Sequence, residues 1–90
     1  MVKEKLKPAE NNDEVTAGEK ELILFNDDIN TFDYVIETLI EVCGHDAVQA
    51  EQCALVAHFN GKCSIKSGPF DSLKPLCEEM LNRELTVSIS

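Results

Sequence analysis

The stretch 47–59 constrains the fold of this 90-residue chain most, because it is apolar on nearly every side of a helix. Asp46 precedes it, with Gln49 three residues later, in the arrangement of a helix-capping box. Asn60 and Gly61 follow and predict the end of the helix. Since a helix without a polar face is usually buried, we expect this one to lie at the centre of a small core.

Further strands and helices are predicted on both sides of this stretch. Apolar or alternating runs predict strands over 22–25, 62–67 and 85–89. Asn30 is the expected N-cap of a helix that ends at Gly44. Asp71 or Ser72 is expected to cap another helix, with Pro75 near its first turn, where proline is tolerated.

The order strand, helix, helix, strand, helix, strand predicts an α+β fold of two layers. We expect a small three-stranded sheet with three helices on one face. Residues 1–20 show no apolar period and are expected to form a flexible N-terminal tail. Residues 21–90 are expected to form a single domain, because a chain of this length has no room for a second one.

Charge narrows the classes of partner. The formal net charge is −9, and no Lys or Arg occurs between Lys20 and Lys62. Nucleic acid and anionic membrane surfaces are both disfavoured, because each attracts basic proteins. An acidic field of this kind would attract cations and ammonium groups, although a solvated face that keeps the protein in solution is the simpler explanation.

The cysteines and the N-terminus predict a cytoplasmic protein. No two of the four cysteines have the Cys-x-x-Cys spacing of a zinc or redox motif. They are expected to be reduced thiols, most of them acting as small apolar core residues. No signal peptide and no apolar run of about 20 residues is visible.

One polar cluster is a candidate site. Asn26, Asp27 and Asp28 directly follow the first predicted strand, and His58 lies in the apolar helix. A local turn explains the first three, and a core histidine explains the fourth. Asp28 and His58 are too few for a convincing metal site, and no nucleophile is evidently paired with His58, so catalysis is disfavoured. His45, after Gly44, is expected to be exposed.

The chain resembles the ClpS family of adaptors of the ATP-dependent Clp protease. The residues that carry the resemblance are Leu24-Phe25-Asn26-Asp27-Asp28, then Asp33-Tyr34-Val35-Ile36-Glu37-Thr38-Leu39, and Ala57-His58-Phe59-Asn60-Gly61-Lys62. The match extends over about residues 21–67. The resemblance implies an adaptor that recognises N-degrons, which are proteins that begin with a bulky hydrophobic residue. It implies no enzymatic activity, cofactor or metal.

The resemblance also assigns roles to residues. Asn26, Asp28 and His58 would bind the free α-amino group of the substrate, whose donors need acceptors when buried. The first side chain would enter a hydrophobic pocket, whose expected wall is Asn30, Phe32, Val35, Ala54, Ala57 and Leu85. The partners implied are N-degron substrates and the N-terminal domain of the Clp AAA+ unfoldase.

Several positions depart from the family pattern. Asn30 stands where Thr is common, Thr31 where Pro is common, and Phe32 where Met is common. Ala54 and Ala57 stand where larger residues are common, so the pocket floor is expected to be roomier. The hypothesis that follows is that large aromatic first residues are accepted at least as well as Leu. The competing interpretation is a non-degradative interaction module similar to the C-terminal domain of the ribosomal stalk protein.

Overall fold

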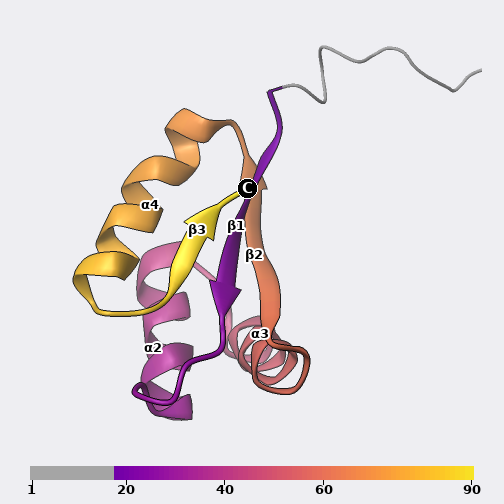
Figure 1. The fold of residues 1–90 in the computed structure, drawn as a ribbon, viewed down its shortest axis with the longest axis vertical. Coiled ribbons are helices and arrows are strands. Elements are labelled where there is room, and N and C mark those ends of the chain that lie inside the picture. Colours follow the sequence, from indigo (N-terminus) through magenta and orange to yellow (C-terminus); the bar gives the residue numbers. More distant parts are fainter. Residues whose placement is uncertain (1–17) are drawn as a thin grey trace, which may run out of the picture.

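A computed structural model describes residues 18–90 of the chain. The strands and helices follow the expected order (Figure 1): β1 (Lys20–Phe25), α2 (Phe32–Cys43), α3 (Ala47–Asn60), β2 (Lys62–Gly68), α4 (Phe70–Asn82) and β3 (Val87–Ile89). The first strand thus begins at Lys20, the last residue of the expected N-terminal tail. Residues 1–17 of that expected tail lie outside the described part.

The sheet has three antiparallel strands in the order β2-β1-β3, so the first strand of the chain is central. Leu24 pairs with Cys63 on one side and with Val87 on the other. The β1–β2 register shifts between Leu22 and Ile23, which marks a bulge. The predicted α+β class and order of elements are confirmed.

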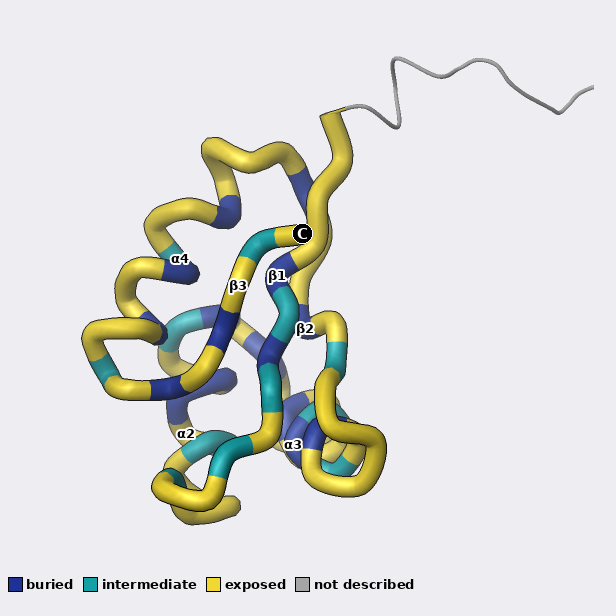
Figure 2. The backbone as a smooth tube through the Cα atoms, viewed as in Figure 1, coloured by how far each residue is buried: buried dark blue, intermediate teal, exposed yellow. Residues whose placement is uncertain are grey.

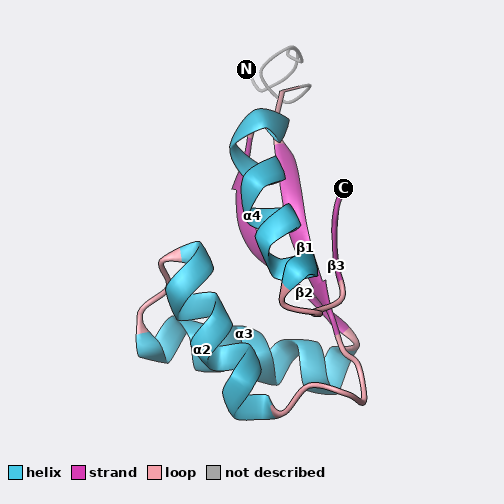
Figure 3. Cartoon of the chain, turned by 90° about the vertical axis from the view of Figure 1, so that its left-hand side faces the viewer, coloured by secondary structure: helices cyan, strands magenta, loops and turns pink. Residues whose placement is uncertain are grey.

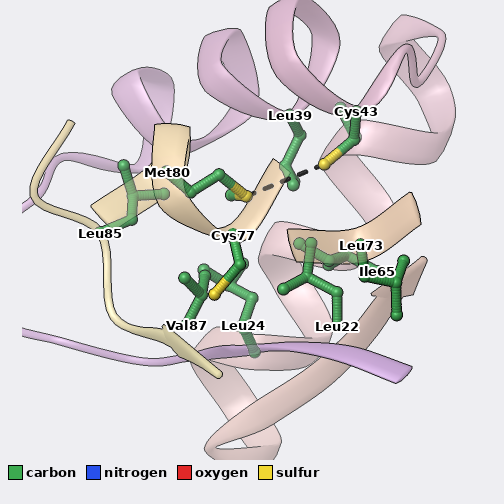
Figure 4. Packing of buried hydrophobic residues seen from close by; sticks show 12 residues of the cluster. Leu22, Leu24, Leu39, Cys43, Ile65, Leu73, Cys77, Met80, Leu85 and Val87 are labelled. Atoms are coloured by element: carbon green, nitrogen blue, oxygen red, sulfur yellow. Dashed lines mark hydrogen bonds between the residues drawn. The ribbon is translucent and has the colours of Figure 1, made fainter. Parts of the chain in front are cut away.

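The core lies on one face of this sheet. Leu22 and Leu24 of β1 are buried, while Ile23 and Phe25 are only partly buried, as expected where successive side chains point to opposite faces. In Figure 2 the buried positions of α4 lie on the side of the helix that is nearest to the strands. Side chains of all three strands meet those of α2 and α4 in the cluster of Figure 4, which includes Leu39, Ile65, Leu73, Met80, Leu85 and Val87.

The three helices take different positions relative to the sheet. Helix α4 runs along the strands, whereas α2 and α3 lie together at the end of the sheet where β1 finishes (Figures 1 and 3). In the core, the Cys43 and Met80 sulfur atoms, 3.8 Å apart, join α2 to α4. The loops before α2 and after α3 therefore meet at the end of β1.

The structure confirms three of the predicted helix ends and contradicts two. Gly44 and Gly61 have positive φ values of 73° and 95°, as the helix ends require, and Asp46 Oδ1 accepts the Gln49 amide at 2.7 Å. The predicted cap at Asn30 is wrong. The cap is Thr31, whose hydroxyl oxygen accepts the Tyr34 amide at 3.1 Å.

The start of α4 was also predicted wrongly. Its N-cap is Pro69, with no side-chain cap, rather than Asp71 or Ser72. Pro75 consequently lies inside the helix instead of near its first turn. Proline has no amide hydrogen, so the helical hydrogen bond to the Asp71 carbonyl is missing.

His45 is buried, with only 5% of its surface exposed, so the prediction that it is exposed is wrong. Its Nε2 lies 2.8 Å from the carbonyl oxygen of Ile65, which can only accept, so Nε2 donates. Nδ1 is buried and has no partner among the atoms of residues 18–90. The loop between α2 and α3 folds back onto β2, an edge strand of the sheet, and the hydrogen bond of His45 joins the two.

The expectation that the apolar helix is central is also wrong. Only Ala50, Ala54 and Ala57 of α3 are buried, and the helix lies at one end of the sheet. Val48 and Phe59 are 70% and 76% exposed. Small alanines bring one face of α3 close to its neighbours, and the larger apolar side chains on the other face remain in contact with solvent.

All four cysteines are free thiols, and Cys43 and Cys77 are buried. Burial raises the pKa of Cys43 and Cys77, and burial beside Cys63 raises the pKa of Cys53 to about 11. Among the described helices, none has the length and apolar character that crossing a bilayer requires.

Candidate functional site

A cavity of about 420 Å³ opens where β1 ends, between α2 and α3. The strand end is fixed on both sides, because the Phe25 amide donates to Thr86 and the Asn26 amide donates to Gly61. The cavity has polar groups from the loop after β1 and apolar groups from the two helices. Its lining consists of Leu24, Phe25, Asn26, Asp27, Asp28, Asn30, Phe32, Val35, Ala54, Leu55, Ala57, His58 and Phe59.

Eight of the nine residues predicted from the sequence line this cavity. The exception is Leu85, which is 3% exposed and belongs to the core cluster. Glu84, with a left-handed φ of 69°, precedes it and turns the chain so that Leu85 enters the core. The prediction that Leu85 forms part of the pocket wall is therefore corrected.

Asn26, Asp28 and His58 come together at the cavity from two segments that are far apart in the sequence. Their side chains form no hydrogen bond or ion pair with any other group in the described part of the chain, and all three residues are exposed. An amide oxygen, a carboxylate and a neutral imidazole nitrogen are all acceptors. The arrangement can therefore accept several hydrogen bonds from one cationic donor.

The apolar side of the cavity comes from the facing helices. Ala54 and Ala57 are three positions apart on α3 and share one helix face, and each is 4% exposed. Val35 and Phe32 come from the first turn of α2. Because the alanines end at Cβ, they leave room that longer side chains would fill, and an apolar group could enter there.

Asp27 holds the loop that carries the polar groups. Its Oδ1 accepts the backbone amides of Ile29 at 3.0 Å and Asn30 at 2.9 Å. Its Oδ2 accepts from Asn30 Nδ2 at 3.0 Å and from the Thr86 hydroxyl at 3.3 Å. Burial raises the pKa of Asp27, but hydrogen bonds from Asn30, Ile29 and Thr86 lower it by more, so the pKa lies below 3.8.

A second set of contacts joins this loop to the turn between α4 and β3. Asn30 Nδ2 also donates to the Glu84 carbonyl at 2.9 Å, and the Tyr34 hydroxyl donates to the Arg83 carbonyl at 2.9 Å. Asn30 thus positions the loop, and its amide nitrogen is already engaged.

The cavity includes five residues that were not predicted to line it. Leu24 and Phe25 belong to the end of β1, Asp27 to the loop, and Leu55 and Phe59 to α3. The Phe59 ring lies edge-on to the His58 ring, with 4.9 Å between centroids and an angle of 78°. Phe59 follows His58 directly, and that adjacency was the signal available in the sequence.

No group of three or more His, Cys, Asp or Glu side chains within residues 18–90 is arranged to hold a metal ion. Asp28 and His58, the pair considered for that role, gain no third ligand of these types in the fold.

The hydrogen bonds to Asp27 predict that its carboxylate titrates at an unusually low pH. Because the folded pKa is lowered, the contribution of the carboxylate to stability is present above the unfolded value of about 3.8 and is lost as the pH falls through the folded value. In NMR spectra, the Ile29 and Asn30 amide protons should shift with a midpoint below pH 3.8. An Asp27→Asn variant should lack this transition. A midpoint at or above the usual pKa of an aspartate would show that these hydrogen bonds do not stabilise the carboxylate.

Comparisons with known proteins identify the family and the fold. A family model described as ATP-dependent Clp protease adaptor protein ClpS matches residues 16–88. A solved structure, that of Agrobacterium tumefaciens ClpS2 bound to L-phenylalaninamide, is similar with a TM-score of 0.75. The alignment covers 81% of this chain and 95% of that chain at 19% identity, so the likeness concerns the fold. A search of curated proteins found no match.

The resemblance seen in the sequence is thereby confirmed. The matched residues include β1, the loop after it, both helices that line the cavity, and the sheet. The chain belongs to the ClpS family of ATP-dependent Clp protease adaptors.

Proposed function

We propose that the protein binds substrate proteins that begin with a bulky hydrophobic residue and delivers them to the Clp AAA+ unfoldase for degradation. In this role the cavity at the end of β1 receives the first residue of the substrate. The observation that carries the proposal is the meeting of Asn26, Asp28 and His58 beside an apolar hollow. The competing interpretation, a stalk-like interaction module, gains no support from the family match.

The polar side of the cavity suits a free α-ammonium group. Such a group has three donors, and leaving them without acceptors in a cavity is costly. Asn26, Asp28 and a neutral His58 offer three different acceptors, and the Asp28 carboxylate adds a charge-assisted hydrogen bond. The absence of Lys and Arg between Lys20 and Lys62 leaves this surface acidic, which favours a cationic ligand.

The apolar side suits the first side chain. A cavity of about 420 Å³ falls within the usual range for small-ligand sites, and much of its wall is aliphatic or aromatic. L-phenylalaninamide, the ligand of the similar ClpS2 structure, carries an amino group and a benzyl group on one carbon. The same two features would meet Asp28 and the hollow beside Ala54 in this protein.

Delivery is a separate part of the proposal. The folded domain would dock on the N-terminal domain of the Clp unfoldase, and residues 1–20 would act during transfer of the substrate. The proposed location of this activity is the cytoplasm.

Blocking the charge of the ligand should abolish binding. A Phe-initiated peptide should bind in fluorescence anisotropy, whereas its Nα-acetylated twin should not, because a charge and donors vanish together. Asp28→Ala should weaken binding of the unblocked peptide about tenfold to a hundredfold, as expected for a lost hydrogen bond between charged groups. Asp33→Ala, at an exposed acidic residue outside the cavity, is the matched control. Equal binding of the two peptides would refute the assignment.

The size of the cavity predicts a preference for aromatic first residues. Peptides that begin with Phe or Trp should bind at least as tightly as one that begins with Leu, because Ala54 and Ala57 leave room for a ring. Ala54→Leu should fill part of the hollow and weaken Trp binding more than Leu binding. A clear preference of the parent protein for Ile or Val would show that the hollow is shaped differently.

Binding and delivery should be separable. Removing residues 1–17 leaves β1 complete, so the affinity for a Phe-initiated peptide should stay within about twofold. Degradation of a Phe-initiated substrate by the reconstituted Clp protease should slow. Unchanged degradation would remove the N-terminal residues from the delivery mechanism.

A further inference from the structure

Phe59 is exposed where the cavity meets solvent. The residue lines the cavity, yet 76% of its surface is accessible. Its only aromatic neighbour in the described chain is the His58 ring, with which it forms a T-shaped pair, and most of the Phe59 side chain remains accessible to solvent. A single exposed apolar residue needs no explanation, but an exposed ring on the rim of a binding cavity is a candidate contact.

The direction of the bound chain follows from the proposed function, on which this inference rests. The α-amino group lies at Asn26, Asp28 and His58, and the first side chain points to Ala54 and Ala57. Both of these sites are taken by the first residue, so the rest of the substrate must leave toward solvent. It therefore leaves across the exposed part of the rim.

Phe59 directly follows His58, which belongs to the proposed amino-group site, and both residues line the cavity. His58 and Phe59 are consecutive, and consecutive Cα atoms are about 3.8 Å apart. An extended substrate advances about 3.3–3.6 Å per residue, so its second residue stays close to the first and within reach of residues next to His58. Leu55, one turn before Phe59 on α3, lines the same cavity and extends the apolar surface.

We propose that Phe59 forms a second subsite, which contacts the side chain of the second substrate residue and favours a large apolar side chain there. The contact removes apolar surface of both partners from water, which stabilises the complex. The preferred substrates are then N-degrons in which a bulky first residue is followed by another apolar residue.

The test compares two peptides that differ only at the second position. Phe-Leu and Phe-Ala peptides avoid glycine, whose flexible backbone would add an unrelated entropy term. The parent protein should bind the Phe-Leu peptide about fivefold to tenfold more tightly in fluorescence anisotropy, where tenfold corresponds to about 1.4 kcal/mol. Phe59→Ala should reduce this ratio to less than about twofold, and Phe59→Tyr, which retains the ring, should preserve it.

Phe70→Ala is the matched control, because Phe70 is an exposed phenylalanine on α4 outside the cavity. It should leave the ratio unchanged. If Phe59 only supports the His58 ring, Phe59→Ala will weaken both peptides equally and keep the ratio, which overturns the proposal. A parent ratio near one overturns it as well. If acetylated peptides bind as well as unblocked ones, the proposed function fails first, and the two failures are thereby distinguished.

Discussion

The Asp27 carboxylate is the interaction on which the candidate site depends. Its two oxygens accept from two backbone amides of the loop, from the Asn30 side chain and from Thr86 before β3. A loop of this length has many accessible conformations, and fixing it costs conformational entropy. The carboxylate offsets that cost by tying the loop to itself and to the neighbouring chain. Asn26 and Asp28 are therefore held at the cavity, while Asp27 itself is engaged within the protein.

Local signals in the sequence predicted most of the fold. Gly44, Gly61 and the Asp46–Gln49 pair mark helix ends through their own backbone conformation or hydrogen bonds, so no tertiary information is needed. The cap of α2 was missed by one residue, because Asn30 and Thr31 are both good caps. Only the fold shows that the Asn30 amide is engaged by Asp27 and Glu84. His45 was missed because nothing local indicates that its loop returns to β2.

The candidate site could also be predicted only in part, because some of its residues are placed by the fold and not by local sequence. Motif residues at the end of β1 and on α3 are recognisable in sequence, and the fold brings them to one cavity. Leu85 could not be assigned from its sequence position, because the left-handed turn at Glu84 decides which way it faces. The apolar composition of α3 was misleading as well. The buried residues of α3 are alanines, whereas the larger apolar residues Val48 and Phe59 face solvent at its two ends.

The buried thiols can be used to detect when the helices that carry them separate from the core. Burial raises the pKa of Cys43 and Cys77, so little thiolate forms near neutral pH while the fold is closed. Because Cys43 lies on α2 and Cys77 on α4, an alkylating reagent would modify each of these two helices only when that helix separates from the core. Mass spectrometry of the alkylated peptides would thus show which of the two helices detaches more often.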